Sequence, residues 1–210
     1  MLVIGLTGGI ASGKSTVATA LEAAGAPVLR SDALAREVVA PGSAGLAEVA
    51  RAFGPGVLGP DGALDRARLG EVVFADVAAR RVLEGITHPR IRLRTLAWLR
   101  ERAAAGVPAA VCDIPLLFEV GLDGPGSFVD RVWVVAVSPE TQLARLMRRD
   151  GLSLDAAQAR LRAQWPLAEK ARRADLVLRN DGSPTDVQEA AVQAWRRCLR
   201  ETGGRGPDAP

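Results

Sequence analysis

Several residue types are scarce in this chain of 210 residues, and their scarcity narrows the classes of protein to which it can belong. Tyr is absent, and four Phe with four Trp leave few side chains on which nucleic-acid bases could stack. Only two Cys are present, Cys112 and Cys198, which form neither a disulfide framework nor a metal-ligand spacing. We therefore expect both thiols to be reduced and buried.

Long hydrophobic runs are also missing from the start of the chain. The first apolar run, residues 2–6, is short, follows no basic segment and is ended by glycines, so we expect neither a signal peptide nor a membrane span. These features favour a cytoplasmic protein with no membrane partner. A hydrophobic content of 48% is enough for one substantial core, and we expect a single domain over residues 1–202.

Positive charge exceeds negative charge only slightly, because 27 Lys and Arg stand against 24 Asp and Glu and leave a net charge of +3. Such an excess is weak for a nucleic-acid partner unless it is concentrated in one place. Lys accounts for only two of the basic residues, Lys14 and Lys170. A Lys in a motif position is therefore informative in this chain.

Lys14 holds such a position, because residues 8–15 read GGIASGKS and satisfy G-x-x-x-x-G-K-[ST] after a short apolar strand. Glycines in this pattern let backbone N–H groups point at an anion, and the helix that begins near Lys14 adds the positive end of its dipole. The motif predicts bound triphosphate, with Lys14 at the β- and γ-phosphates and the Ser15 hydroxyl on Mg²⁺. The expected nucleotide site comprises Gly8, Gly9, Ala11, Ser12, Gly13, Lys14, Ser15 and Thr16.

Apolar segments that alternate with helical patterns predict an α/β fold. The alternation favours a parallel five-stranded sheet flanked by helices, which is the phosphate-loop NTPase fold. Strands are expected near residues 2–7, 27–30, 109–113, 132–137 and 175–178.

A long helical insertion is predicted between the second and third strands, over residues 34–105. It contains an irregular Gly- and Pro-rich connection at residues 54–64, and Thr87-His88-Pro89 is expected to begin a new helix. After the last strand, a final amphipathic helix follows Ser183, and the tail at residues 203–210 is expected to be disordered because it has nothing to bury.

Basic residues are concentrated in one hairpin, residues 143–173, where eight basic residues face three acidic ones and give +5 within 31 residues. The pattern predicts helices broken at Gly151 and capped again at Ser153. A solvated helical surface would explain this composition. Beside a triphosphate site, however, it favours a lid over residues 140–173 that closes on the transferring phosphate.

Two carboxylates follow predicted strands and are candidates for the site. Asp32 lies where a strand leads into a helix, so it faces a ligand or caps that helix. Asp113 ends a buried strand and could hold a Mg²⁺-bound water, orient Lys14 or cap local N–H groups. The loop after it, residues 114–119, is apolar and forms either a contact surface for an apolar part of a substrate or core. The single His, His88, has a structural and a functional interpretation.

Several motifs together identify a family. They are GLTGGIASGKST at the start, Asp32 followed by ALAREVV, His88-Pro89, DIPLLFE from Asp113, SPETQLARL from Ser138 and ADLVLRN from Ala174. In this order they closely resemble dephospho-coenzyme A kinase over nearly the whole chain. The resemblance implies transfer of the ATP γ-phosphate to the 3′-hydroxyl of dephospho-CoA, the last step of coenzyme A synthesis. We expect a monomer or weak homo-oligomer without a nucleic-acid partner.

The resemblance also implies roles for individual residues. Lys14, Asp32 and Arg145 would be catalytic, with Asp32 near the acceptor hydroxyl. Arg149 and Asn180 would add to the nucleotide site, Ser15 would bind the metal, and the acceptor side would comprise Asp32, His88, Asp113, Leu117 and Phe118. One departure from the family pattern is Arg30, which stands where a second acid usually lies two positions before Asp32.

Three other functions use the same motif. A nucleoside or nucleotide monophosphate kinase shares the phosphate loop, core and lid but lacks the DIPLLFE loop. A nucleic-acid-binding NTPase would need a basic stripe and stacking aromatic residues. A nucleotide-gated binding protein would need no acid on the acceptor side.

Overall fold

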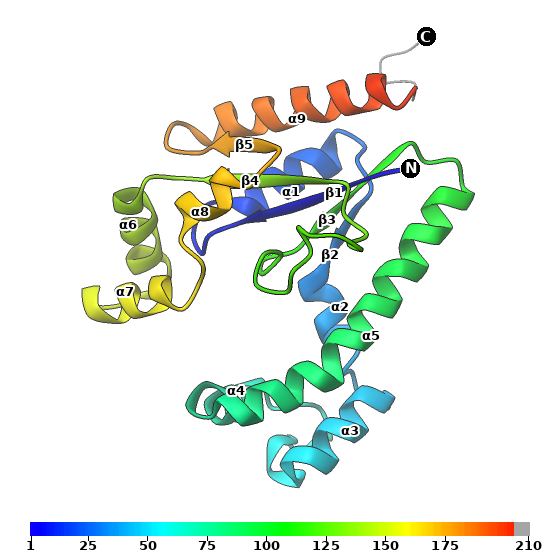
Figure 1. The fold of residues 1–210 in the computed structure, drawn as a ribbon. Coiled ribbons are helices and arrows are strands. Elements are labelled where there is room, and N and C mark those ends of the chain that lie inside the picture. The colour runs from blue at the N-terminus through cyan, green and yellow to red at the C-terminus, as the bar shows by residue number, and fades with distance from the viewer. Residues whose placement is uncertain (204–210) are drawn as a thin grey trace. The chain divides into compact units, whose positions relative to one another are not determined.

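The structure, a computed structural model, describes residues 1–203 (Figure 1), so residues 204–210 of the expected disordered tail lie outside the described residues. The chain divides into two compact units. The first comprises the segments before and after residues 30–100, and the second comprises residues 30–100. The elements in chain order are β1 (Leu2–Gly8), α1 (Lys14–Ala23), β2 (Val28–Arg30), α2 (Ser31–Glu37), α3 (Ala44–Phe53), the 3-10 helix η1 (Pro55–Val57), α4 (Arg66–Ala75), α5 (Val77–Ala104), β3 (Ala109–Asp113), β4 (Arg131–Ala136), α6 (Pro139–Asp150), α7 (Leu154–Arg162), α8 (Leu167–Arg172), β5 (Leu176–Arg179) and α9 (Pro184–Glu201).

The five strands form one sheet in the order β2-β3-β1-β4-β5, as the predicted parallel α/β fold requires. Strand β1 lies at the centre and pairs in parallel with β3 and β4. All five residues of β3 are buried, which explains why this strand is apolar throughout and does not alternate. Because the central strands run the same way, β1 and β3 end at the same edge, where Leu6 lies beside Asp113.

Helices α1 and α9 share one hydrophobic cluster with the sheet. Val17 and Leu21 of α1 are fully buried in this cluster, together with Trp195 of α9 and Trp133 of β4. On α9, Val187, Ala191, Trp195 and Leu199 are all buried, so the predicted buried sides of α1 and α9 are confirmed. Packing against the sheet fixes where the N-terminus of α1 lies, directly after the phosphate loop.

The loop after β3 packs on β1 at a glycine. A Cβ atom at Gly5 would lie 2.5 Å from Leu117 Cδ1 and 2.9 Å from Val129 Cγ1. Leu117 and Phe118 are 0% and 3% exposed, whereas Leu116 is 44% exposed. Of the two interpretations of this apolar loop, core packing therefore accounts for most of its side chains.

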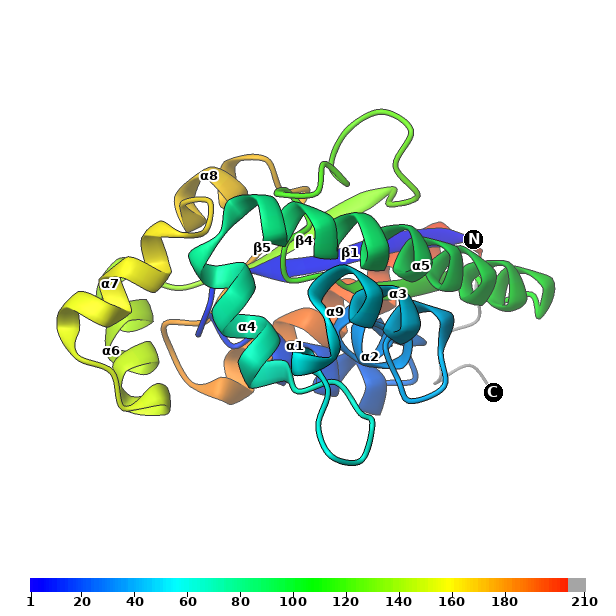
Figure 2. The same cartoon turned by 90° about the horizontal axis from the view of Figure 1, so that it is seen from below.

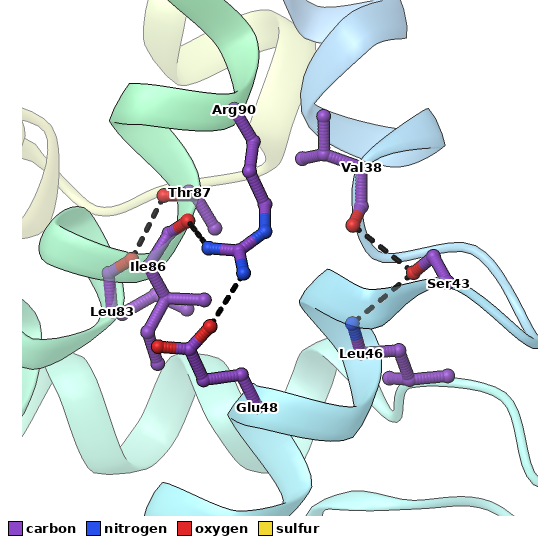
Figure 3. A network of polar contacts seen from close by, with 8 residues as sticks. All are labelled: Val38, Ser43, Leu46, Glu48, Leu83, Ile86, Thr87 and Arg90. Carbon is purple, nitrogen blue, oxygen red and sulfur yellow. Dashed lines mark hydrogen bonds and ion pairs between the residues drawn. The ribbon is translucent and has the colours of Figure 1, made fainter.

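Residues 30–100 have their own small core. Val38 and Val39, which follow α2, form it with buried residues of α3, η1, α4 and α5, and Val49 is fully buried. Figure 3 shows polar contacts beside this core: the Ser43 hydroxyl accepts a hydrogen bond from the Leu46 amide at the start of α3, and Arg90 donates to Glu48 Oε2 at 2.5 Å. The predicted cap at Ser43 is confirmed.

The prediction that Thr87-His88-Pro89 begins a new helix is wrong, because α5 runs without interruption from Val77 to Ala104. Pro89 has no N–H for the carbonyl of Gly85, which costs a helix about 3 kcal/mol. Side chains support the neighbouring turns: the Thr87 hydroxyl donates to the Leu83 carbonyl at 2.8 Å, and Arg90 donates to the Ile86 carbonyl at 2.6 Å (Figure 3). These contacts and the burial of Ile86 outweigh the local preference of proline for a helix start.

Three short helices, α6, α7 and α8, follow β4 at one end of the first unit (Figure 2). Ser138 and Ser153 cap α6 and α7 by accepting hydrogen bonds from Thr141 N and Ala156 N. Gly151 takes a left-handed conformation with φ 64° at the end of α6. The predicted break and second cap in this basic region are therefore confirmed. Within residues 1–203, no helix is long and apolar enough to cross a membrane.

Both cysteines are buried free thiols, as predicted. Burial, with a smaller effect of the neighbouring Asp113 carboxylate, raises the pKa of the Cys112 thiol to about 12. Burial also raises the pKa of Cys198. Since the thiolate is the reactive form, both groups should be inert at neutral pH.

We therefore expect the native protein to release almost no chromophore from a disulfide thiol reagent at pH 8 within minutes. The same reagent should detect two thiols per chain in guanidinium. A Cys198→Ala variant isolates the thiol on β3, and rapid labelling of Cys112 in that variant under native conditions would contradict its burial.

Candidate phosphate-binding site

The phosphate loop joins the C-terminal end of β1 to the start of α1. Gly13 precedes α1 with φ 91°, and no side chain caps this helix. The first amides of α1 thus remain available to an anion, and they lie at the positive end of the helix dipole. Ala11 is the one non-glycine residue of the described chain with a positive φ, 59°. The loop therefore stores some backbone strain beside the expected phosphates.

Two glycines of the motif are required by close approach. A Cβ atom at Gly8 would lie 2.5 Å from Ser12 Oγ and 2.8 Å from the Val135 carbonyl oxygen. A Cβ atom at Gly13 would collide with the side-chain amide of Asn180. Any larger residue at either position would have to move the loop or its neighbours.

Lys14 and Asp113 form an ion pair at the sheet edge. The Nζ atom of Lys14 contacts Oδ1 of Asp113, and their side chains are only 14% and 7% exposed. Asp113 reaches Lys14 because β3 and β1 are neighbours in register. Of the three roles considered for Asp113, orienting Lys14 is the one that this contact supports.

Arginine and asparagine side chains border the same loop. Arg145 on α6 brings Nη1 to 4.0 Å from the position that a Cβ at Gly13 would occupy. Asn180, which is 5% exposed, donates from Nδ2 to the Ser12 carbonyl at 2.8 Å. Arg145 was predicted to be catalytic and Asn180 to belong to the nucleotide site, and both lie against the phosphate loop.

Arg149 lies one turn further along α6 and is engaged elsewhere. Its Nε is 2.7 Å from Oδ1 of Asp150, and Arg160 Nη1 is 2.7 Å from the other carboxylate oxygen. Hydrogen bonds from Arg149, together with both guanidinium charges, lower the pKa of Asp150. Arg149 would have to leave this exposed pair to reach a nucleotide.

The acceptor-side residues of the first unit are mostly buried. Phe118 stacks on Trp165 with ring centroids 6.1 Å apart, and the Arg173 guanidinium lies 5.7 Å from the Phe118 centroid. Phe118 therefore connects the loop after β3 to the segment before α8. A direct contact of Leu117 or Phe118 with an acceptor stays a prediction.

Asp32 and His88 belong to the unit of residues 30–100, and both side chains are exposed. Asp32 lies inside the first turn of α2, whereas Arg30 occupies the N-cap position. The interpretation of Asp32 as the N-cap is therefore wrong. Its carboxylate is open to solvent at the start of a helix, and its role toward an acceptor stays a prediction, as does that of His88.

Sequence reasoning missed two glutamines that contact the loop. Gln164 Oε1 accepts a hydrogen bond from the Ile10 amide at 2.9 Å, and Gln142 Nε2 donates to the Ile10 carbonyl at 2.9 Å. Gln142 lies within the SPETQLARL motif, but the motif does not indicate what its side chain contacts, and Gln164 lies in a helix connection outside the motifs. Only the fold brings them to the phosphate loop.

The residues at this site fit a magnesium ion. The Ser15 side chain is exposed in the first turn of α1, next to Lys14. No group of three or more His, Cys, Asp or Glu residues suited to a metal occurs in the described part of the chain. A single protein ligand, the Ser15 hydroxyl, is enough for Mg²⁺, because this ion takes most of its ligands from water and phosphate oxygens.

Known proteins are similar to this chain over nearly its whole length. The profile of the dephospho-CoA kinase family matches residues 2–186. A dephospho-CoA kinase of Anaeromyxobacter dehalogenans is 54% identical over 213 aligned residues, covering 100% of this chain and 98% of the relative. The relative from Geobacter sulfurreducens is 49% identical, covering 94% and 98% of the two chains.

Solved structures agree with the sequence relatives. The dephospho-CoA kinase from Campylobacter jejuni has a TM-score of 0.71 and 31% identity, with 95% of this chain and 98% of that chain covered. A crystal structure from Thermus thermophilus reaches a TM-score of 0.77 at 40% identity, covering 95% and 97%. The phosphate loop alone would indicate only a superfamily, but the profile and the relatives cover almost the whole chain. The chain therefore belongs to the dephospho-CoA kinase family.

Proposed function

We propose that this enzyme transfers the γ-phosphate of ATP to the 3′-hydroxyl of dephospho-CoA and thereby forms coenzyme A. The observation that carries the proposal is the complete phosphate loop with Lys14 held against Asp113, in a chain of this family. Phosphoryl transfer needs little covalent chemistry from the protein, so positioning and charge stabilisation supply most of the rate.

Lys14 provides the charge nearest to the transferring group. Its ammonium group pairs with Asp113, and it would contact the β- and γ-phosphate oxygens of ATP. Arg145 lies close to Gly13 and adds a second cation, while the first amides of α1 hold the other phosphates. These donors act on charge that is spread over the phosphoryl oxygens in the transition state.

Ser15 would hold Mg²⁺ through its hydroxyl. When bound, the ion would neutralise part of the charge of the phosphate groups. The remaining predicted nucleotide contacts, namely Gly8, Gly9, Ala11, Ser12, Thr16, Arg149 and Asn180, complete the proposed site.

Asp32 is proposed to orient the acceptor hydroxyl and to accept its proton. Its carboxylate is exposed and lies in the first turn of α2, so it is free to reach a substrate. The helical region 34–105 with His88, and the loop with Asp113, Leu117 and Phe118, would bind the rest of dephospho-CoA.

Residues 140–173, called the lid segment below, would close over the triphosphate and exclude water. We further propose that the protein is cytoplasmic and that it is a monomer or a weak homo-oligomer.

Removing the Lys14 charge should stop transfer without unfolding the protein. We expect Lys14→Met to lower turnover by at least about 10²-fold, since single charge-stabilising donors are worth 10²–10³ in rate. The variant also leaves a nearly buried Asp113 carboxylate unpaired, which should lower the thermal midpoint.

The double variant Lys14→Met/Asp113→Asn separates the two effects, because it removes both charges of the pair. Its thermal midpoint should recover while its turnover stays low. Near-normal turnover in either variant would show that Lys14 is not part of the transfer site.

Replacing the Asp32 carboxylate should affect chemistry more than nucleotide binding. We expect Asp32→Asn to lower turnover at saturating substrates by about 10²–10⁴-fold, the usual range for general-base assistance. The dissociation constant for ATP, measured by calorimetry, should change little. Glu189→Gln, at an exposed acid on α9 outside the proposed acceptor region, is the matched control. Weaker ATP binding with unchanged turnover would instead assign Asp32 to the metal site.

The enzyme should recognise the pantetheine arm of its acceptor as well as the adenosine ribose. We expect dephospho-CoA to be phosphorylated far more efficiently than AMP or adenosine, because binding energy from the pantetheine arm can align the ribose 3′-hydroxyl. The ratio of kcat/KM values and the position of the new phosphate test this expectation. Equal efficiencies, or a 5′-diphosphate product from AMP, would identify a nucleotide kinase.

A further inference from the structure

Two parts of the lid segment contact one residue of the phosphate loop. Gln142 lies near the start of α6, and Gln164 lies two residues after the end of α7. Gln142 Nε2 donates to the Ile10 carbonyl and Gln164 Oε1 accepts from the Ile10 amide, each at 2.9 Å. Both backbone groups of Ile10 are therefore held by side chains that are 132 and 154 positions away.

The Ile10 peptide precedes the strained part of the loop. Ala11 follows it with φ 59°, a conformation that a non-glycine residue keeps only where the surrounding structure enforces it. The two glutamines hold the two peptide groups on either side of the Ile10 Cα atom, the second of which leads into Ala11. The geometry of the loop toward phosphate is therefore linked to the start of α6 and to the connection after α7.

The position of Gln164 depends in turn on contacts between its neighbour Trp165 and the loop after β3. The amide of Trp165, its neighbour, donates to Glu119 Oε1 at 3.2 Å, and the same oxygen lies 2.7 Å from Nζ of the fully buried Lys170. Glu119 belongs to the loop after β3, whose Phe118 stacks on Trp165. One carboxylate thus places the connection between α7 and α8 from which Gln164 reaches Ile10.

An open pocket of about 920 Å³ borders this connection, and its lining includes Gln142, Gln164 and Trp165. Directed hydrogen bonds therefore add to ring stacking in determining how the connection meets the phosphate loop, and a movement of the lid segment would change them.

We propose that Gln142 and Gln164 are positioning residues for phosphoryl transfer, which hold the Ile10 peptide and couple the lid segment to the shape of the phosphate loop. Neither glutamine needs to touch a substrate to act in this way. The inference rests on the proposed kinase activity for its effect on rate, but the contact itself can be tested without any substrate.

The two glutamines play opposite roles in their hydrogen bonds, which allows a charge-matched test. At position 164 the Ile10 N–H needs an acceptor, and an ionised Glu supplies one. At position 142 the Ile10 carbonyl needs a donor, and an ionised Glu supplies none. Gln164→Glu and Gln142→Glu add the same charge near the same residue, yet only the second removes a bond. Gln164→Met and Gln142→Met remove the bonds without charge.

The first measurement is hydrogen exchange of the Ile10 amide in the ligand-free protein at pH 8. It should be about tenfold or more faster in Gln164→Met than in the wild type, and slowed again in Gln164→Glu, because a protecting hydrogen bond has been lost and then restored. Gln193, exposed on α9, provides Gln193→Met and Gln193→Glu as controls for general effects. Unchanged exchange in Gln164→Met would overturn the contact and with it the proposal.

The second measurement is steady-state transfer to dephospho-CoA at pH 8. Gln142→Glu and both Met variants should lose about 10- to 100-fold in kcat, the effect of a misplaced reactive group, while KM for dephospho-CoA changes little. Gln164→Glu should turn over about tenfold faster than Gln164→Met. Equal losses in the two Glu variants, or full turnover in the Met variants, would overturn the proposal.

A wild-type enzyme that fails to phosphorylate dephospho-CoA would instead contradict the proposed function. The exchange result would then still decide whether the two glutamines hold the loop.

Discussion

The phosphate loop must keep several backbone N–H groups free for an anion, and this constraint governs what surrounds it. A buried backbone group without a partner is costly, so each group that does not face the anion needs one within the protein. The Ile10 amide and carbonyl are bound by Gln164 and Gln142, and the Ser12 carbonyl is bound by Asn180. Because the Ser12 amide also donates to the Gly9 carbonyl, other amides of the loop are the ones left to face an anion.

The parallel sheet brings those partners together. Strand β1 lies between β3 and β4, so the residues that follow each strand meet beside the loop. Asp113 at the end of β3 contacts Lys14, and Asn180 after β5 contacts Ser12. Nucleotide contacts therefore need no long excursions of the chain, which is the general reason that open α/β sheets bind ligands at this edge.

A second set of contacts connects the acceptor-side loop to the basic helices. Glu119 pairs with the buried Lys170, Phe118 stacks on Trp165, and Arg173 lies over both rings while pairing with Asp123 at 2.5 Å. Lys170 is one of only two Lys in the chain, and it is fully buried. Some basic residues of the hairpin thus form ion pairs near its C-terminal end, as Lys170 and Arg173 do. Arg145 instead borders the phosphate loop.

Local patterns in the sequence determined the phosphate loop, the five strands, the caps at Ser43, Ser138 and Ser153, and the buried sides of α1 and α9, because these depend on residues close together in the chain. The tertiary structure decided that α5 continues through Pro89, that Arg30 and not Asp32 takes the N-cap of α2, and that two glutamines hold Ile10. Packing and side-chain hydrogen bonds outweigh the preference of a single proline, and no local pattern marks a glutamine whose partner lies more than 130 positions away. Periodicity therefore reveals the elements, whereas the partners of the site's polar groups depend on which segments the sheet places side by side.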